Sequence, residues 1–383
     1  MTRSAIVIGA GIIGMSVAWR LAQQGVHVEV LDGCGLATGT SGNSFAWLSM
    51  RSGIAGTSKT ATARSNIDLG KVELVAAHAQ LTVGGFAEHV ALRHEFGGAP
   101  WLHQGGCLEW GEPPGALAEA VTADSHLLYP AEVARVEPWL QLPESIGQVS
   151  FFPSEGHVDV PLLVGRLALG LREAGVTIRD SAEVAELLVR DGTVQGVVTT
   201  SAQRLEADVV VSCAGPWTDK ICQLAGVDLP LAPTQGMLTI TRPSPVRLNT
   251  LISTPTVHLR DDGSGRVIIG SYEFEAEVAQ GQDTIPFPEA AYGMYEAAAK
   301  LLPGLHGTGI EAVRIGQRAI PADGYPVAGY APGVQGLYVI CTHGGIRLGP
   351  LLGRLAAREI CAGTRDERLS LFTPDRLTPG VVR

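Results

Sequence analysis

The sequence predicts an α/β protein in which a mainly parallel sheet with covering helices is joined to a second, mainly antiparallel β unit of α+β type. Apolar, strand-like runs end three times in a glycine-rich turn that opens a helix, at residues 9–14, 213–217 and 342–350. Between residues 226 and 321 the pattern changes to short strands with polar turns. Strands that alternate with helices favour parallel sheets, whereas consecutive short strands favour antiparallel pairing.

The first turn follows an apolar run, Ser4–Ile8, and has the form G-x-G-x-x-G. Gly9 permits the tight turn, Gly11 lets the backbone approach a pyrophosphate, and Gly14 lets the helix pack closely on the strand. The helix over residues 12–24 presents N–H groups and the positive end of its dipole to that anion. This pattern predicts a Rossmann-like, dinucleotide-binding domain.

A second strand, His27–Leu31, places Asp32 where a carboxylate accepts hydrogen bonds from the ribose hydroxyls. An acidic residue at this position disfavours a 2′-phosphate and therefore NADP. The following residues 35–44 are rich in Gly, Ser and Thr, and the apolar Phe45 to Leu48 come next. We expect this loop to hold the second phosphate, the linker and one face of the reactive ring of the cofactor.

The composition limits the possible partners. At 383 residues the chain is long enough for two or three folding units, or for one domain with a large insertion. A net charge of −10 without a clustered basic face disfavours nucleic acid. No apolar run reaches the length of about 18 residues needed for a transmembrane helix.

The cysteines and the N-terminus indicate a cytoplasmic location. Six cysteines are scattered without C-x-x-C pairs, which suits reduced thiols. The chain begins with its first strand, so we expect no signal peptide.

Residues 61–96 have helical periodicity and predict helices that are interrupted at Gly84-Gly85. His89 and His94 lie five positions apart, which matches neither a same-face helical pair nor a zinc pattern. We expect them to be surface or core histidines, and we predict no metal site.

The middle of the chain returns to alternating strands and helices. Asp159 followed by Val160-Pro161 predicts a helix start, and Gly175 predicts its end. Strands are expected at 176–179, 182–189, 194–200 and 207–212, with a hairpin turn at Asp191-Gly192. The second glycine turn, residues 213–217, then opens another helix.

The last part of the chain combines both patterns. Strands at 237–241, 256–260 and 267–271 predict an antiparallel sheet, with a helix over residues 288–302 laid on it. The strand Leu337–Cys341 then leads into the third turn, and a helix that starts at Pro350 runs to residue 359.

The three turns, in this order, resemble the D-amino-acid oxidase superfamily of FAD enzymes, which includes glycine oxidase, sarcosine oxidase and D-amino-acid dehydrogenases of the small-subunit type. The matching segments are residues 9–32, 40–44, 207–217, 318–329 and 343–350, and they span nearly the whole chain. The resemblance implies an FAD-binding domain made of residues 1–85, 151–225 and 322–383. It implies a substrate domain made of residues 86–150 and 226–321.

The resemblance also implies a set of residues that bind FAD. They are Gly9, Ala10, Gly11, Ile12, Ile13, Gly14, Leu31, Asp32, Thr40, Ser41, Gly42, Asn43, Ser44, Val184, Gly215, Trp217, Gly344, Gly345 and Ile346. The Gly344-Gly345 turn would face the flavin pyrimidine edge, where N–H groups at or just before the start of the Pro350 helix stabilise negative charge on the reduced flavin.

The substrate side is implied in the same way. Arg318 stands where glycine oxidase-like members keep an arginine for the substrate carboxylate, and guanidinium binds carboxylate bidentately. His258 stands in the strand where relatives place a tyrosine over the substrate. Further pocket candidates are Arg51, Trp47, Arg260, Tyr272, His343 and Arg347.

Two departures from the family pattern bear on the chemistry. Members with covalent flavin use a His in the loop after the second strand or a Cys shortly before the final glycine-rich turn; here the loop holds Asn43 and the Arg318 region has no Cys. We therefore expect non-covalent FAD, with Cys341 as the remaining candidate for attachment. Ile268 aligns with a lysine that activates oxygen in sarcosine oxidase-like members, so the electron acceptor, oxygen or quinone, stays open.

The implied reaction is oxidation of the Cα–N bond of an amino acid or secondary amine by hydride transfer to flavin N5, giving an imine that hydrolyses. One alternative is an FAD-dependent 2-hydroxy-acid dehydrogenase, for which His258 would act as the base. A second is a flavin-binding subunit of a hetero-oligomeric amine dehydrogenase. NAD as the cofactor is disfavoured, because the loops 40–44 and 343–350 would then have nothing to hold.

Overall fold

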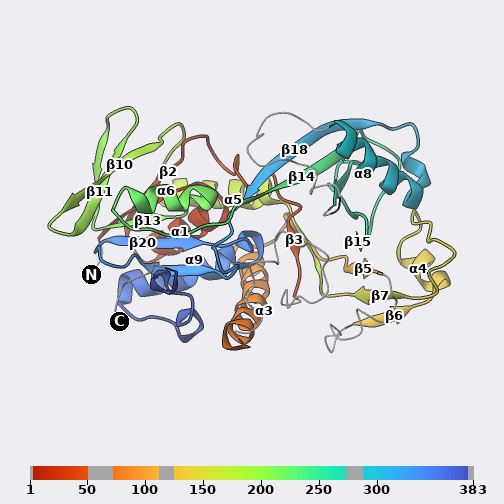
Figure 1. Ribbon diagram of the computed structural model, residues 1–383, viewed down its shortest axis with the longest axis horizontal. Helices are drawn as coiled ribbons and strands as arrows, with labels where there is room; N and C mark the ends of the chain where they lie inside the picture. Colours follow the sequence, from red (N-terminus) through yellow and green to blue (C-terminus); the bar gives the residue numbers. More distant parts are fainter. Residues whose placement is uncertain (1–2, 51–71, 112–124, 272, 274–287, 378–383) are drawn as a thin grey trace.

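The computed structural model describes residues 3–50, 72–111, 125–271, 273 and 288–377 (Figure 1). Two predicted pocket residues, Arg51 and Tyr272, lie outside the described residues, as does the expected helical segment 61–71. All six cysteines are described and are free thiols. Among the described residues, no helix has both the length and the apolar character needed to cross a bilayer.

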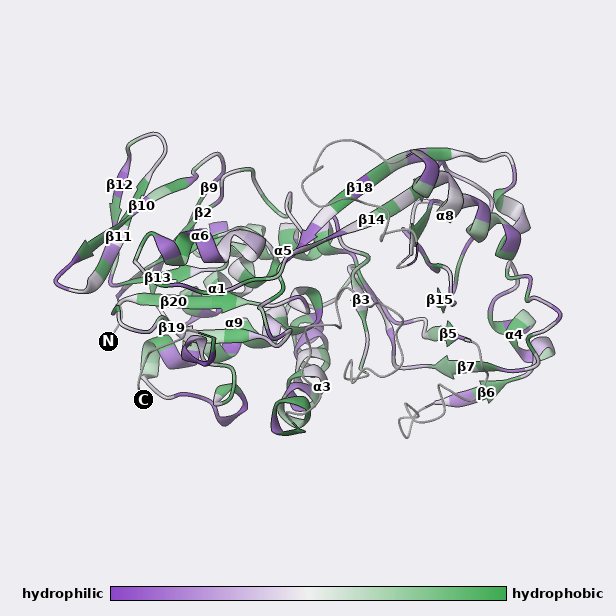
Figure 2. Cartoon of the chain, in the orientation of Figure 1, coloured by the Kyte–Doolittle hydropathy of each residue, from purple (hydrophilic) through white to green (hydrophobic). Residues whose placement is uncertain are grey.

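A six-stranded sheet forms the centre of one half of the molecule, in the order β19-β20-β13-β1-β2-β9. All neighbouring pairs are parallel except β19 with β20, which confirms the predicted α/β class. In Figure 2 the central strands β13 and β20 are coloured as hydrophobic, as expected for strands buried on both faces. The strands are β1 (Ser4–Ile8), β2 (His27–Leu31), β9 (Thr177–Arg179), β13 (Val209–Ser212), β19 (Val327–Tyr330) and β20 (Leu337–Cys341).

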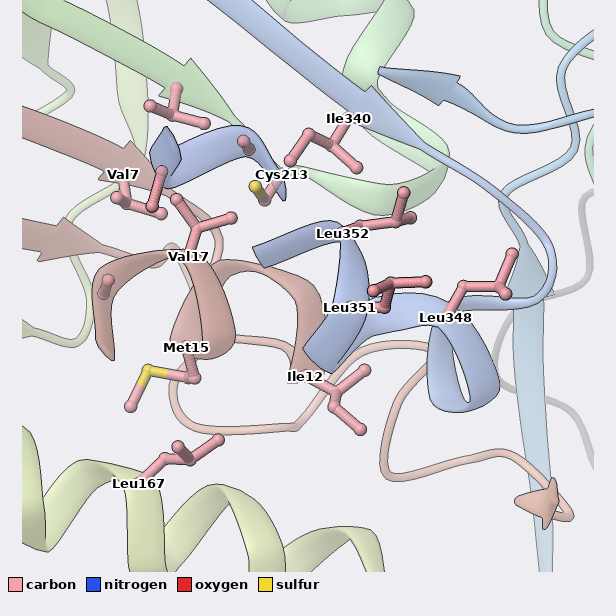
Figure 3. Packing of buried hydrophobic residues seen from close by; sticks show 14 of the residues in the cluster. Val7, Ile12, Met15, Val17, Leu167, Cys213, Ile340, Leu348, Leu351 and Leu352 are labelled. Atoms are coloured by element: carbon pink, nitrogen blue, oxygen red, sulfur yellow. The ribbon is translucent and has the colours of Figure 1, made fainter. Parts of the chain in front are cut away.

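Helices cover this sheet and pack tightly on one another. They are α1 (Ile12–Gln23), α3 (Val72–Glu95), α5 (Val160–Glu173), α6 (Thr218–Gln223) and α9 (Gly345–Ala362). Met15 of α1 lies toward Leu167 of α5, and Leu351 and Leu352 of α9 lie near the other side of α1 (Figure 3). A Cβ on Gly353 would stand 2.7 Å from the backbone of Ser16, so small residues on α9 let it approach α1 closely.

Two short sheets are attached to the central one. Strands β10 (Val184–Arg190), β11 (Thr193–Thr199) and β12 (Arg204–Glu206) form an antiparallel sheet. Its first turn has Asp191 and Gly192 at φ of 50° and 72°, as the predicted hairpin requires. Strands β3 (Trp47–Leu48), β8 (Gly156–Val158) and β4 (Leu102–His103) form the other sheet.

The other half of the molecule is built on an eight-stranded sheet in the order β18-β14-β17-β16-β15-β5-β7-β6. The pairing is antiparallel except between β15 and β5, so the second predicted unit is mainly antiparallel. The long strands β14 and β18 run from this half toward the first (Figure 1). The strands are β5 (Cys107–Glu109), β6 (His126–Leu128), β7 (Val149–Phe152), β14 (Thr234–Thr241), β15 (Leu251–Ser253), β16 (His258–Asp261), β17 (Val267–Gly270) and β18 (Ile310–Arg318).

One face of this sheet is covered by α8 (Pro288–Leu301), which the sequence predicts over residues 288–302. Met237 and Ile269 on the sheet pack with Met294 of α8 in a second hydrophobic core. The opposite face carries the side chains of the candidate site. The remaining helices are α4 (Pro130–Val136) and the short 3-10 helices η2 (Gly215–Trp217), η3 (Pro303–Leu305), η4 (Glu367–Leu369) and η5 (Pro374–Arg376).

The expected helix break at Gly84-Gly85 is wrong, because α3 runs without interruption through both glycines. The two glycines instead allow α3 to pack closely against α9. A Cβ on Gly85 would overlap the carbonyl oxygen of Arg347, and one on Gly84 would stand 3.0 Å from the side chain of Leu351. α3 also crosses the proposed domain boundary at residue 85, so that division stays a proposal.

Candidate functional site

The first glycine corner joins β1 to α1 and has no room for side chains. Gly9 has a φ of 107°, where other residues are strained, and a Cβ on it would overlap the carbonyl oxygen of Cys213. A Cβ on Gly14 would overlap the carbonyl oxygen of Gly9. The N–H of Gly9 also donates to the carbonyl of Leu31 at 2.7 Å, which ties the corner to β2. The turn itself therefore requires both glycines.

Asp32 lies directly after β2 and beside this corner. Its Oδ2 accepts the N–H of Ala10 at 2.7 Å, and its Oδ1 accepts the N–H groups of Cys34 and Gly35 at 2.8 Å each. These bonds hold the carboxylate at the carboxyl edge of the sheet, which is where ligands of open α/β sheets bind.

The loop of residues 35–44 folds over the N-terminus of α1. The hydroxyl of Ser41 accepts the N–H of Ile12 at 3.2 Å, and a Cβ on Gly11 would stand 2.9 Å from the same oxygen. Ser44 closes the loop by donating its hydroxyl to the Ser41 carbonyl at 2.9 Å. N–H groups and hydroxyls thus gather at the positive end of the helix dipole, with a glycine at the point of closest approach. This chemistry fits a diphosphate.

The same loop is anchored to the second sheet. The hydroxyl of Thr40 donates to the carbonyl of Gln317 on β18. A Cβ on Gly316 would stand 3.1 Å from the Cβ and the carbonyl oxygen of Asn43. The predicted cofactor loop is therefore packed against the end of the strand that carries Arg318.

The three glycine corners meet in space. A Cβ on Gly345, in the third corner, would stand 3.4 Å from the side chain of Ile13 in the first. Cys341, just before the third corner, places its Sγ 3.7 Å from the carbonyl oxygen of Gly215 in the second. Gly9 of the first corner also touches Cys213. The first corner therefore contacts the other two, and the strand end just before the third corner contacts the second.

Two further predicted cofactor residues lie near this junction. Trp217 is the last residue of the second corner and would be 3.7 Å from a Cβ on Gly39, so it borders the loop. Val184 is the first residue of β10. A Cβ on Gly33 would stand 3.3 Å from the Cβ of the preceding residue, Glu183. The structure thus places Val184 beside the segment that follows Asp32.

The helix after the third corner begins at Gly345, so the predicted start at Pro350 is wrong. The first helical hydrogen bond runs from the N–H of Leu348 to the carbonyl of Gly344 at 2.8 Å. Pro350 lies inside α9. Gly345 and Ile346 are therefore in the first turn of this helix, and their N–H groups precede its first helical hydrogen bond.

Arg318 and His258 lie on the same face of the eight-stranded sheet. Strand register pairs Gly236 with Gly316 and His258 with Gly270. A Cβ on Gly236 would stand 2.8 Å from the Arg318 guanidinium, and one on Gly270 would overlap the His258 ring. The two glycines therefore allow the guanidinium and the imidazole to lie flat against the sheet.

Arg318 is held by the neighbouring strand. Its Nη1 donates to the carbonyl of Gln235 at 2.8 Å and approaches the hydroxyl of Thr234 at 3.4 Å. This anchoring fixes the plane of the guanidinium, which a bidentate interaction with a carboxylate requires.

Aromatic rings lie beside His258, and one of them is hydrogen-bonded to a buried carboxylate. The Phe45 ring packs edge-on at 4.4 Å, and the Trp47 ring lies at 6.4 Å. Trp47 Nε1 donates to Glu155 at 2.8 Å, and the Ser49 hydroxyl donates to the other oxygen of the same carboxylate at 2.7 Å. Glu155 is only 2% exposed, so these bonds stabilise a buried negative charge.

The histidines of this region are neutral near pH 7. Burial lowers the pKa of His258 to about 3, and the charge of Arg318 lowers it further in the same direction. Burial also lowers the pKa of His343 to about 3, with smaller contributions from Arg318, Arg347 and His78. The pKa of His78 is lowered to about 3 by burial and by Arg347.

His343 is nevertheless exposed to solvent. The charges of Arg318 and Arg347 both act on this ring, so we expect its surroundings to favour an anionic group.

The two other predicted pocket arginines that the structure describes, Arg347 and Arg260, differ in position. Burial lowers the pKa of Arg347 to about 10, and Glu155 opposes that change, so Arg347 stays charged at neutral pH. Arg260 is buried and donates to the carbonyls of Phe45 at 2.8 Å and Asp261 at 3.1 Å. Arg260 therefore holds the backbone that positions Phe45.

Sequence reasoning missed Glu155 and His78. Glu155 stands alone between Ser154 and Gly156, with no spacing pattern, and His78 is one of three histidines on the long helix α3. Only the tertiary fold brings both near Arg347.

A separate cavity of about 410 Å³ contains none of the predicted site residues. Its lining includes the stacked rings of His103 and His157, together with Asn249 and Asp261. Within the described part of the chain, no three His, Cys, Asp or Glu side chains are grouped to hold a metal ion.

Comparisons with known proteins agree with this geometry. A family model described as FAD dependent oxidoreductase matches residues 4–359. Glycine oxidase of Geobacillus kaustophilus is 23% identical over 92% of this chain and 91% of its own length. Mitochondrial sarcosine dehydrogenase of Mus musculus is 25% identical over 96% of this chain, which spans only 40% of the length of that protein.

The fold is also similar to that of solved structures. Glycine oxidase from Geobacillus kaustophilus superposes with a TM-score of 0.80 at 21% identity, covering 100% of both chains. Iminodiacetate oxidase from Chelativorans sp. BNC1 superposes with a TM-score of 0.79 at 20% identity, covering 97% of this chain and 98% of the other.

Proposed function

Because the chain belongs to the FAD dependent oxidoreductase family, as its resemblance predicts, we propose that it oxidises the Cα–N bond of an amino acid or secondary amine. The observation that carries this proposal is the position of Arg318. Its guanidinium lies flat on Gly236 and is close enough to His343 and His258 to affect their pKa values. His343 belongs to the third glycine corner, so the arginine lies near one of the cofactor corners.

FAD is the cofactor of this family, and the glycine corners fit it. The backbone at Gly11 and the N-terminus of α1 would hold the diphosphate, Asp32 the ribose, and the first turn of α9 the pyrimidine edge of the flavin. When bound, FAD accepts the hydride that leaves the substrate Cα. Non-covalent binding is supported by Asn43 in the loop and by the burial of Cys341, which raises the pKa of that thiol to about 12 and leaves it a poor nucleophile.

Arg318 is proposed to bind the substrate carboxylate and so to orient the Cα–H bond. A guanidinium already fixed by the carbonyl of Gln235 makes this interaction without reordering its own side chain. Phe45, Trp47 and His258 provide an aromatic wall that excludes water from the reacting carbon. The substrate amine supplies its own lone pair, and the imine product hydrolyses in water.

The low pKa of His258 favours amine oxidation over 2-hydroxy-acid oxidation. A hydroxy acid needs a base to remove the hydroxyl proton, and an effective base has a pKa near the working pH. The pKa of His258 is about 3, so its imidazole is a weak proton acceptor at neutral pH. An amine needs no such base.

The test is an anaerobic screen of purified protein with amino acids, N-substituted amino acids and 2-hydroxy acids, following the flavin absorbance. We expect amino or N-substituted amino acids to bleach the flavin and 2-hydroxy acids to leave it unchanged. Bleaching by hydroxy acids alone would reject the proposal. A colourless protein that binds no added FAD would reject the cofactor site as well.

The same sample discriminates the remaining alternatives. Return of colour on admitting air identifies oxygen as an acceptor, whereas return only with a quinone identifies a dehydrogenase. Flavin that binds but is bleached by none of the substrates would favour a subunit that needs a partner. The domain division and the cytoplasmic location stay predictions.

A further inference from the structure

Pro350 leaves one carbonyl in the first turn of α9 without its normal partner. In an α-helix each carbonyl accepts the N–H four residues later, and proline has no N–H. Pro350 lies inside α9, so the carbonyl of Ile346 cannot be satisfied within the helix. A buried carbonyl without a hydrogen bond is costly, so a donor from elsewhere is needed.

His89 of α3 supplies that donor. Its Nε2 lies 2.8 Å from the carbonyl oxygen of Ile346, and the residue is 0% exposed. Because a carbonyl can only accept, Nε2 carries the proton. Nδ1 is buried and has no hydrogen-bond partner among the described residues. Burial lowers the pKa of His89 to about 4, so the ring is neutral in the Nε2–H tautomer.

The contact depends on the close approach of α3 to α9. A Cβ on Gly85 would overlap the carbonyl oxygen of Arg347, so at that point α3 presents only backbone. His89 lies one helical turn later, on the same face of α3. Gly85 therefore sets the helix separation at which the His89 ring reaches Ile346.

We propose that His89 is a positioning residue for the flavin site: its N–H fixes the Ile346–Arg347 peptide and strengthens the Arg347 N–H as a donor toward the cofactor. The carbonyl of Ile346 and the N–H of Arg347 belong to one peptide group, and a hydrogen bond to the carbonyl polarises the N–H. That N–H points toward the N-terminal end of α9. This inference rests on the proposed placement of the flavin at the third corner.

The test compares three variants by the midpoint potential of the bound flavin, measured against a reference dye. His89→Leu removes the donor and should lower the equilibrium ratio of reduced to oxidised flavin about tenfold, equivalent to about 30 mV for two electrons. His89→Gln keeps an amide N–H near the Nε2 position and should stay within about threefold of the wild type. His89→Leu combined with Pro350→Ala should recover the ratio, because the second substitution gives the Ile346 carbonyl a backbone N–H within the helix.

Leu92→Ala is the matched control, because it also removes a buried side chain of α3. It should lower the melting temperature without changing the potential. An unchanged potential in His89→Leu would overturn the inference, and so would a loss that Pro350→Ala does not repair. If His89→Leu does not fold, His89→Asn replaces it, since its shorter amide cannot reach Ile346 and the same loss is expected. A wild-type protein that binds no FAD would instead reject the proposed function.

Discussion

At the scale of single residues, the proposed cofactor site depends on glycines at positions where a Cβ would collide with neighbouring atoms. Gly9 and Gly14 are required by the turn itself, since a Cβ on either would overlap a backbone carbonyl. Gly11 is different. Its φ of −75° suits any residue, and the nearest atom to its Cβ would be the hydroxyl of a flexible side chain, Ser41, at 2.9 Å. A substitution at Gly11 should therefore affect cofactor binding without preventing folding.

We predict that Gly11→Ala folds but binds FAD at least about tenfold more weakly, because the added methyl group stands where the backbone meets the diphosphate. Titration of the apoprotein with FAD, followed by flavin fluorescence, measures the Kd. Gly165→Ala, in the middle of α5 with no neighbour near its Cβ, should leave the Kd unchanged. Equal affinity of Gly11→Ala and the wild type would rule out the diphosphate at this helix.

Arg318 carries the second prediction at this scale. Arg318→Lys should raise KM for an amino acid about 10- to 100-fold, because lysine cannot form the bidentate pair with the carboxylate. Steady-state kinetics with an amino acid and with the corresponding amine lacking the carboxylate measure this effect. Only the amino acid should be affected.

Arg190→Lys is the control, since Arg190 is an exposed arginine on β10. It should leave both KM values near those of the wild type. A similar loss for both substrates in Arg318→Lys would indicate a general structural effect instead of carboxylate binding.

At the scale of secondary structure elements, buried charges join the helices that carry the corners. Arg20 of α1 pairs with Glu88 of α3 at 2.7 Å, and their side chains are 8% and 7% exposed. Glu88 also pairs with Arg354 of α9 at 2.7 Å. One carboxylate thus connects α1, α3 and α9, which sets where the N-termini of α1 and α9 lie.

We predict that Glu88→Ala lowers the free energy of unfolding by about 3 kcal/mol or more, because Arg20 would keep a buried charge with less compensation. Urea unfolding of the apoprotein measures it. Glu206→Ala removes an ion pair at the surface, where the side chains of Glu206 and Arg204 are 69% and 54% exposed. It should lower the free energy of unfolding by less than about 1 kcal/mol. If Glu88→Ala and Glu206→Ala unfolded at the same urea concentration, the Arg20–Glu88–Arg354 network would not contribute to stability.

The elements themselves were largely predictable where their signals are local. The strands Ser4–Ile8, His27–Leu31 and Leu337–Cys341 have the predicted bounds, and Asp159 caps α5 by accepting the N–H of Leu162 at 3.1 Å. The start of α9 was missed because Pro350 resembles a first-turn proline. Here the helix continues through it, and His89 satisfies the carbonyl that the proline leaves open.

At the scale of the whole molecule, buried neutral histidines make stability depend on pH. His89 and His258 have pKa values lowered by burial from 6.5 to about 4 and about 3, whereas the unfolded chain keeps ordinary values. Below pH 6.5 the unfolded state binds more protons, so the free energy of unfolding falls as the pH falls.

At pH 5 each of these two residues should reduce the free energy of unfolding by about 2 kcal/mol relative to neutral pH. Urea unfolding between pH 7 and 5 measures the slope, and His89→Gln should make it shallower. Leu92→Ala, which removes a buried side chain that does not titrate, should leave the slope unchanged. A slope that is the same in His89→Gln and the wild type would contradict the assignment of His89 as neutral and buried.

The sequence by itself determined the glycine corners, the α/β class and the cofactor family, because these depend on backbone conformation and on strand and helix patterns that neighbouring residues specify. Only the tertiary structure decided which side chains lie beside Arg318 and His258. Strand register places Gly236 under Arg318 and Gly270 under His258, and helix packing brings His89 to Ile346. Such contacts join residues far apart in the chain. Their geometry depends on how whole sheets and helices pack, and a local sequence pattern does not specify that packing.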